Sequence, residues 1–529
     1  MKKKQIIEKE IYVISALINK GDYQKALNCL RVLEAKNYNN KSIIFNMASL
    51  LIDIGFGLKN SKIVREGIDK GEKLLKDPSC KDLKANLYYN CANGYMSIYQ
   101  IEYDKKRGIK QIVDNKNLQD AKRNFREAIK EVDNFDFKLR RQLWTNYGNC
   151  LDSLGRGIEA LYAYEGALKI DSNFSMALGN KAKAMRFFAD ISGIYKAAIY
   201  IKSYQILKSI LENEDLIEFG GIAAKRGFEN EIKQIESKFK DKSLLTKNLE
   251  HPQYDLTHAT TFEKFYIEFC SKHKLFLNFH IHEGKCEASI VDPIFISLTT
   301  SLTDNKTFYD LAKYINQIKE DYITARLLLV QSQFKRGDFN NISRRTTFVN
   351  TLDYSVFNIY IGLLKNAFKE AYNILDKISR FINEYFELEK EGDIYFKSIW
   401  QYKINKNDWR IRPKIINSKN ISLYSLYDIF IDFKSGYYKK ISEIRNALTH
   451  ERLAIYDSSI LTKWDNKNDI YNIGYDTMLS QTIKLLQLIK SSIIYLINFV
   501  QLEENKKRKD STGLIVPMYV DTMQFLDGN

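Results

Sequence analysis

Apolar side chains recur at helical spacing along most of the chain, but the pattern changes twice. Residues 1–245 contain loosely repeated amphipathic helices, residues 246–302 include an alternating apolar run, and residues 303–505 return to long amphipathic helices. Residues 506–529 form a basic tail. A period near 3.6 indicates helix and a period of two indicates strand. We therefore expect a mostly α protein: a solenoid of helical hairpins, a short α/β connector and a four-helix bundle.

The clearest repeat covers residues 143–171 and predicts two antiparallel helices. Its turn is Leu154-Gly155-Arg156, where the glycine provides the left-handed conformation that ends a helix. Small residues are expected where the two helices approach closely, and aromatic residues fill the gaps between them. The positions that carry this pattern are Trp144, Gly148, Leu151, Gly155, Ala160, Tyr164 and Ala167.

Two further units have a related pattern. One begins near Ile11, with a turn at Gly21 and a second glycine, Gly55, 34 residues later. The other spans residues 88–130 and carries a basic insertion at 105–117. Spacing and residue types resemble the tetratricopeptide repeat, although Ser172 stands where that repeat prefers proline. The resemblance implies stacked hairpins with a concave face that binds a protein partner.

The connector and the bundle are predicted from local patterns. Alternation at residues 275–282 indicates one or two short strands. Four helices are expected at 306–335, 355–390, 421–449 and 473–503, with polar linkers at 402–420 and 457–470. The most apolar stretch, Ser491–Val500, is about half the ~20 residues that span a bilayer. We interpret it as part of a buried core helix.

Composition narrows the class of protein. The chain has 529 residues, only 5 prolines and 24 glycines, which disfavours turn-rich β architectures. Its formal charge of +16 favours contact with a polyanion such as RNA, but a generally lysine-rich composition would explain the charge equally well. The six cysteines are scattered rather than arranged as a disulfide framework. Since Glu8, Lys9 and Glu10 interrupt any apolar leader, we expect a cytoplasmic, soluble protein.

Histidine is scarce, and the most specific pattern uses one of the six. Residues 444–450 read Ile-Arg-Asn-Ala-Leu-Thr-His, an Arg-x4-His motif near the end of the third predicted bundle helix. The motif resembles the signature of HEPN-fold ribonucleases, and repeats followed by such a bundle resemble bacterial defence and toxin proteins. The resemblance implies Arg445, His450 and Asn446 as catalytic residues, RNA as substrate, a homodimer, and no metal or other cofactor.

The chemistry of these side chains fits that implication. RNA carries its own nucleophile, the ribose 2′-hydroxyl, so His450 can move a proton while Arg445 stabilises the phosphate charge. Asn446 can orient either group. On an ideal helix a five-residue offset separates Arg445 from His450 by roughly 140°, so we expect a bend near Thr449 or a site shared between two protomers. Alternatively, Arg445 pairs with Glu443 or Asp432, and His450 merely ends the helix.

A second cluster consists of Cys270, His273, His280, His282 and Cys286. These are zinc-ligand types, but the spacing lacks two matched pairs, so we expect a structural role. No GxxxxGK[ST], GxGxxG, HExxH or GxSxG string occurs, which leaves nucleotide hydrolysis, dinucleotide binding, zincin proteolysis and elbow-serine hydrolysis without support.

We therefore expect a metal-independent endoribonuclease of an antiviral, abortive-infection or toxin-type system, which leaves a 2′,3′-cyclic phosphate and a 5′-hydroxyl and is controlled by its repeats. Two alternatives remain. One is a non-catalytic scaffold or peptide-responsive regulator, and the other is a zinc-stabilised nucleic-acid binder. Loss of RNA cleavage on mutation of Arg445 or His450 would distinguish the enzyme from the scaffold, and metal analysis would test the zinc binder.

Overall fold

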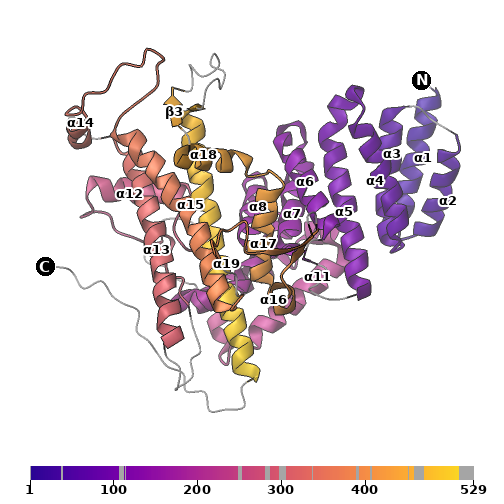
Figure 1. The fold of residues 1–529 in the computed structure, drawn as a ribbon. Coiled ribbons are helices and arrows are strands. Elements are labelled where there is room, and N and C mark those ends of the chain that lie inside the picture. The colour runs from indigo at the N-terminus through magenta and orange to yellow at the C-terminus, as the bar shows by residue number, and fades with distance from the viewer. Residues whose placement is uncertain are drawn as a thin grey trace. The chain divides into compact units, whose positions relative to one another are not determined.

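A computed structural model describes most of the chain in two compact units. One comprises Met1–Ala189 and Lys196–Glu250, and the other Asp190–Tyr195 and His251–Asn529. Figure 1 shows both, from indigo at the N-terminus to yellow at the C-terminus. The described residues are 2–36, 40–106, 112–113, 115–247, 253–279, 286–296, 306–335, 337–388, 392–405, 408–450, 452–457 and 470–510.

The N-terminal unit consists of consecutive helices that pack as hairpins (Figure 1). The predicted solenoid of helical hairpins is therefore confirmed. Asn40 and Asn115 cap two of the helices, because their side chains accept otherwise unpaired N–H groups of the first turn. The helices are α1 (Lys2–Asn19), α2 (Tyr23–Glu34), α3 (Lys41–Gly57), α4 (Ser61–Leu75), α5 (Lys84–Lys106), α6 (Lys116–Lys130), α7 (Phe137–Ser153), α8 (Gly157–Ile170), α9 (Ser175–Phe187), α10 (Lys196–Ile210) and α11 (Glu214–Glu236).

The α7–α8 hairpin matches the repeat predicted at 143–171. Gly155 ends α7 with φ +78°, as the turn requires. Gly148 lies against the buried ring of Tyr164, so small and aromatic residues interlock as expected. The 34-residue step from Gly21 to Gly55 does not mark equivalent positions. Gly21 forms a turn with φ +80°, whereas Gly55 lies inside α3 against Val64 of α4.

The C-terminal unit is built around long helices that bury their apolar faces against one another. The predicted helices at 306–335, 355–390 and 473–503 correspond to α13 (Lys306–Gln333), α15 (Ile359–Tyr385) and α19 (Tyr475–Asp510). Smaller helices are α12 (Thr261–Lys272), α14 (Gly337–Ser343) and α16 (Pro413–Ser418). By length and composition α19 could cross a membrane, but 83% of its most apolar window is buried inside the unit, which confirms a core helix. It also includes the first residues of the expected basic tail.

The third predicted bundle helix, 421–449, is two helices. α17 (Ile421–Lys434) ends at a Schellman motif, in which Gly436 has φ +83° and Tyr437 N–H donates to Asp432 O at 2.9 Å. A new helix, α18 (Lys439–His450), then begins. Amphipathic spacing continues through the break, so the periodicity alone predicted one helix. As a result, α18 has a direction of its own.

Four short strands lie within or beside the expected linkers. β1 (Gln401–Asn405) and β2 (Asp408–Ile411) form an antiparallel hairpin within the 402–420 segment, with Lys403 opposite Trp409. β3 (Arg452–Tyr456) pairs in parallel with β4 (Ile470–Gly474), and these strands flank the second linker. Residues 458–469 of that linker lie outside the described residues. The strand predicted at 275–282 is wrong for residues 275–279, which are irregular, and 280–282 lie outside the described residues.

Candidate active site

The Arg-x4-His motif lies on α18, whose apolar stripe fixes its orientation. Ile441, Ile444 and Ala447 recur every three residues and are buried against the other helices. Arg445 is half-buried at the edge of this stripe, and His450, the last residue of α18, is exposed. Burial of the stripe therefore leaves both motif side chains accessible to a substrate.

Arg445 and His450 contact one another within a single protomer. Arg445 Nη1 lies 3.4 Å from His450 Nε2, and it donates to Asn446 Oδ1 at 3.3 Å. The Thr449 hydroxyl donates to Arg445 O at 2.8 Å within an uninterrupted helix. The two side chains therefore meet within one continuous helix, without a break near Thr449. The long arginine side chain reaches around the helix, so the 140° offset between Cα positions does not keep the two functional groups apart.

The alternative pairing of Arg445 is wrong for Glu443. Glu443 lies 3.6 Å from Lys439 Nζ and accepts a hydrogen bond from Tyr471 Oη at 3.0 Å. Asp432 is buried, and no ion pair joins it to Arg445 among the described residues. Arg445 therefore keeps its charge available at the surface, where it can meet a phosphate group.

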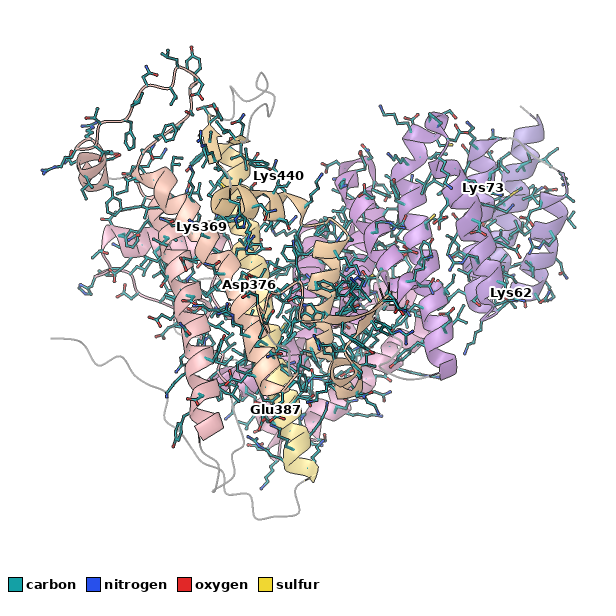
Figure 2. All side chains as sticks on the ribbon, viewed as in Figure 1. Lys62, Lys73, Lys369, Asp376, Glu387 and Lys440 are labelled. Atoms are coloured by element: carbon teal, nitrogen blue, oxygen red, sulfur yellow. The ribbon has the colours of Figure 1, made fainter. Side chains whose placement is uncertain are left out.

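Residues of α15 and of the loop after it surround the Arg445 side chain. The guanidinium carbon lies 5.7 Å from the ring centre of Tyr372, whose pKa burial raises to about 12. Asp376, labelled midway along α15 in Figure 2, accepts the Phe396 backbone N–H at 2.8 Å. Burial raises the pKa of Asp376, and this backbone bond and the Arg445 charge oppose that shift. Lys397 donates to Ser442 Oγ at 3.3 Å.

The sequence did not single out Tyr372, Asp376 or Lys397. Tyr372 and Asp376 repeat at helical spacing among many apolar residues of α15, and Lys397 is one lysine in a lysine-rich chain. Their place beside Arg445 comes from the packing of α15 on α18. A local signal that would have found them does not exist, because only long-range contacts bring the residues together.

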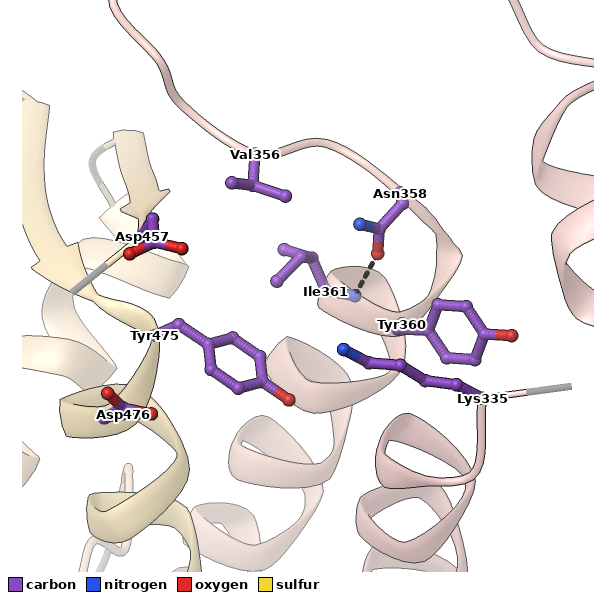
Figure 3. A pocket seen from close by; sticks show the side chains of 8 residues that line it. All are labelled: Lys335, Val356, Asn358, Tyr360, Ile361, Asp457, Tyr475 and Asp476. Carbon is purple, nitrogen blue, oxygen red and sulfur yellow. Dashed lines mark hydrogen bonds between the residues drawn. The ribbon is translucent and has the colours of Figure 1, made fainter. Parts of the chain in front are cut away.

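Two of the hollows among the described residues lie in the C-terminal unit. One of about 330 Å³ is lined by Lys397, Gln401, Trp409, Phe430, Phe433 and Lys434, and it shares Lys397 with the Arg445 surroundings. The other, of about 220 Å³, opens where α15 and α19 begin (Figure 3). There Lys335 and Tyr475 project from α13's end and α19's start, and Asn358 caps α15 by accepting the Ile361 N–H.

The second sequence cluster is only partly described. His280 and His282 lie outside the described residues. Cys270 is buried in α12, where burial raises its thiol pKa to about 12 and disfavours the thiolate that binds zinc. Burial also lowers the pKa of His273. The backbone of Cys286 pairs with that of Gln253 in an isolated antiparallel β-bridge. Within the described residues no three His, Cys, Asp or Glu side chains are placed to hold a metal ion.

Solved structures with similar helical arrays include the MamA protein, with 18% identity, a TM-score of 0.25, and coverage of 40% of this chain and 93% of that one. The TPR2AB domain of yeast Sti1 in complex with pHSP90 has 13% identity, a TM-score of 0.17 and coverage of 44% and 99%. The C-terminal part of a TPR repeat-containing protein from Cytophaga hutchinsonii has 13% identity, a TM-score of 0.19 and coverage of 45% and 99%.

No curated protein sequence matches the chain significantly. A family model described as LA2681-like HEPN matches residues 302–503, the segment that contains the long helices, both strand pairs and the Arg445–His450 contact. The match identifies residues 302–503 as an LA2681-like HEPN domain.

Proposed function

We propose that the C-terminal unit is a metal-independent endoribonuclease whose catalytic residues are Arg445 and His450, with Asn446 as a positioning residue. The observation that carries the proposal is the 3.4 Å contact between Arg445 Nη1 and His450 Nε2 at an accessible surface of an HEPN domain. A proton-transfer group and a fixed cation at that separation can act on one phosphate.

The proposed reaction needs only groups of the protein and the RNA. The ribose 2′-oxygen attacks the adjacent phosphorus, His450 Nε2 takes the 2′ proton, and the 2′-O–P bond forms. The P–O5′ bond breaks, and the leaving 5′-oxygen takes a proton from a second acid. Arg445 stabilises the charge on the non-bridging oxygens in the transition state. The products are a 2′,3′-cyclic phosphate and a 5′-hydroxyl.

A homodimer would supply the second acid. Two copies related by a two-fold axis bring two Arg445–His450 pairs to one interface, so that one His450 acts as base and the partner's His450 acts as acid. The contact within one protomer supports each pair as a preassembled half-site. Sedimentation of the purified chain would test the dimer directly.

The N-terminal unit is proposed to bind the protein partner or trigger that controls cleavage. Half-buried amides form a ladder across its hairpins: Asn146 Nδ2 donates to Tyr89 Oη at 3.0 Å and to Asn93 Oδ1 at 3.1 Å, and Asn180 Nδ2 donates to Asn149 Oδ1 at 2.8 Å. Such amides can exchange these bonds for those of a bound polypeptide backbone. We place this system in the cytoplasm, in antiviral defence or as a toxin.

The test is cleavage of end-labelled total RNA and tRNA by the purified full-length protein in EDTA. Arg445→Ala and His450→Ala should each reduce the rate by about 10²- to 10⁴-fold. Lys439→Ala is the matched control, because it removes one positive charge from the exposed face of the same helix. It should cleave like the wild type, and the products should carry cyclic-phosphate ends.

If cleavage is equal in all four proteins, the activity does not come from this site and the proposal is wrong. If no protein cleaves, the genes are expressed in cells, because cells supply a trigger that the purified protein lacks. Toxicity of the wild-type gene that both active-site mutations abolish then supports the nuclease. Equal behaviour of wild type and mutants supports the non-catalytic scaffold.

A further inference from the structure

The hollow beside the active site combines aromatic and cationic side chains. Its lining consists of Lys397, Gln401, Trp409, Phe430, Phe433 and Lys434, which include two lysines, three aromatic rings and no carboxylate. A volume of about 330 Å³ lies at the lower end of small-ligand sites, roughly 300–1,000 Å³. The composition favours a flat, apolar group that is attached to negative charge.

The β1–β2 hairpin and α17 supply the two walls. Trp409 on β2 is 53% exposed, which is unusual for tryptophan, and Lys403 faces it across the hairpin on the same side. The opposite wall, on α17, is formed by the buried rings of Phe430 and Phe433, and these two rings are the apolar floor on which a ligand would rest. An exposed indole above an apolar floor provides a stacking surface for a planar ring.

The lysines are held at the rim of this hollow. Lys434 Nζ donates to Gln401 Oε1 at 3.2 Å and lies 5.9 Å from the Phe430 ring centre. Lys397 Nζ lies 5.6 Å from the Phe433 ring centre. These positions place positive charge beside the stacking surface. Proteins that bind single-stranded nucleic acids combine the same two features, cationic side chains for the phosphates and aromatic rings for the bases.

A short path joins the hollow to Arg445. Phe433, which forms part of the floor, packs edge-on against Tyr372 with ring centres 6.2 Å apart. Tyr372 in turn contacts Arg445, whose guanidinium carbon lies 5.7 Å from the Tyr372 ring centre. Lys397 also contacts Ser442, one turn before Arg445 on α18. The hollow and Arg445 are therefore linked through the Tyr372 ring and through Lys397, which places the Arg445–His450 pair next to the hollow.

We propose that this hollow is a subsite for an unpaired base of single-stranded RNA. Trp409 stacks on the base, and Lys397 and Lys434 bind the flanking phosphates. The proposal rests on the nuclease function proposed above, and it adds that the substrate must be unpaired next to the cut. A duplex keeps its bases stacked inside, where Trp409 cannot reach them. A base held here fixes the position of a nearby phosphate over Arg445.

The test is binding of a fluorescein-labelled ten-nucleotide 2′-O-methyl RNA, measured by fluorescence anisotropy. This probe lacks the nucleophilic hydroxyl, so binding is measured whether or not the protein cleaves. Trp409→Ala should weaken the single strand's affinity by about 5- to 150-fold, the usual range for losing one stacked base. Trp409→Phe, which keeps a ring, should restore most of it. Ile404→Ala is the matched control, because Ile404 is an exposed apolar residue of the same hairpin and lies outside the lining.

Charge is tested with Lys434→Gln. This variant should reduce the slope of log Kobs against log salt concentration by about 0.7, the value expected for one lost phosphate contact with a single strand. A blunt duplex of the same sequence should bind weakly, and Trp409→Ala should leave its affinity unchanged. Circular dichroism confirms that each variant is folded.

Each outcome separates the subsite from the nuclease. Trp409-dependent binding supports the subsite, and it stands without the nuclease if the purified protein does not cleave and toxicity in cells is indifferent to Arg445→Ala and His450→Ala. If cleavage depends on Arg445 but Trp409→Ala does not change the affinity for the single strand, the nuclease proposal is supported and the subsite proposal is wrong. Absence of measurable single-strand binding, or tighter binding of the duplex, also overturns it.

Discussion

Replacing Gly148 with alanine tests how closely the repeat helices approach. A Cβ atom at this position of α7 would lie 2.4 Å from Cε1 and 2.7 Å from Cδ1 of Tyr164 on α8. Carbon atoms ordinarily pack about 3.5–4.0 Å apart. The Tyr164 ring is 1% exposed and its hydroxyl donates to Asn149 Oδ1 at 3.0 Å, so it cannot move aside without losing contacts.

The size of the effect follows from opposing contributions. Overpacking a core costs about 1–3 kcal/mol, and loss of the Tyr164 hydrogen bond costs about 1 kcal/mol more. Alanine regains about 1 kcal/mol over glycine inside a helix. We therefore expect Gly148→Ala to destabilise the hairpin by about 2 kcal/mol. Gly227 in α11 has no neighbouring atom within 4 Å of such a Cβ, so Gly227→Ala should stabilise its helix by up to about 1 kcal/mol.

Hydrogen exchange with mass spectrometry measures both effects in the intact chain. Peptides from α7 and α8 should exchange roughly 30-fold faster in Gly148→Ala, since about 1.4 kcal/mol corresponds to tenfold. Peptides from α17, in the other unit, serve as the internal reference. Protection of α7 and α8 equal to or greater than that of the wild type would refute the close approach of Gly148 and Tyr164.

Two further predictions concern buried charge in the C-terminal unit. Arg326 is 3% exposed, and its guanidinium donates to both carboxylate oxygens of Asp292, at 3.1 and 2.7 Å. Arg326→Ala should destabilise the unit by about 3–5 kcal/mol, because it leaves the Asp292 carboxylate without its cation. Urea unfolding, with the exposed Arg344→Ala as control, measures this, and equal midpoints would contradict it. Burial raises the pKa of Asp376, so the folded state holds its proton to higher pH than the unfolded chain does. The stability that this group contributes is therefore present below its unfolded pKa of about 4 and is lost as pH rises through the folded value. As pH rises through the folded-state pKa of Asp376, the thermal midpoint of Asp376→Asn should increase relative to that of the wild type. Thermal midpoints that change in parallel with pH in the two proteins would contradict this reasoning.

The candidate site was predictable from sequence only where its residues are neighbours in the chain. Arg445, Asn446 and His450 are close in sequence, so their types and spacing identified them before any fold was known. Their contact was harder to predict, because an angular offset between Cα positions ignores the length of an arginine side chain. Their catalytic roles remain predictions until cleavage is measured.

Local sequence determined the helical class, the α7–α8 hairpin and its turn at Gly155, because period, small residues and left-handed glycines act within a few residues. Tertiary structure alone decided the rest. The break at Gly436 is hidden by continuing amphipathic spacing, and the β1–β2 hairpin lies in a segment that is too polar to show a strand pattern. Tyr372 lies beside Arg445, and Trp409 lines a hollow together with Lys397, only because elements that are distant in sequence pack together. Contacts across such separations depend on which surfaces bury one another, and no short window of sequence contains that information.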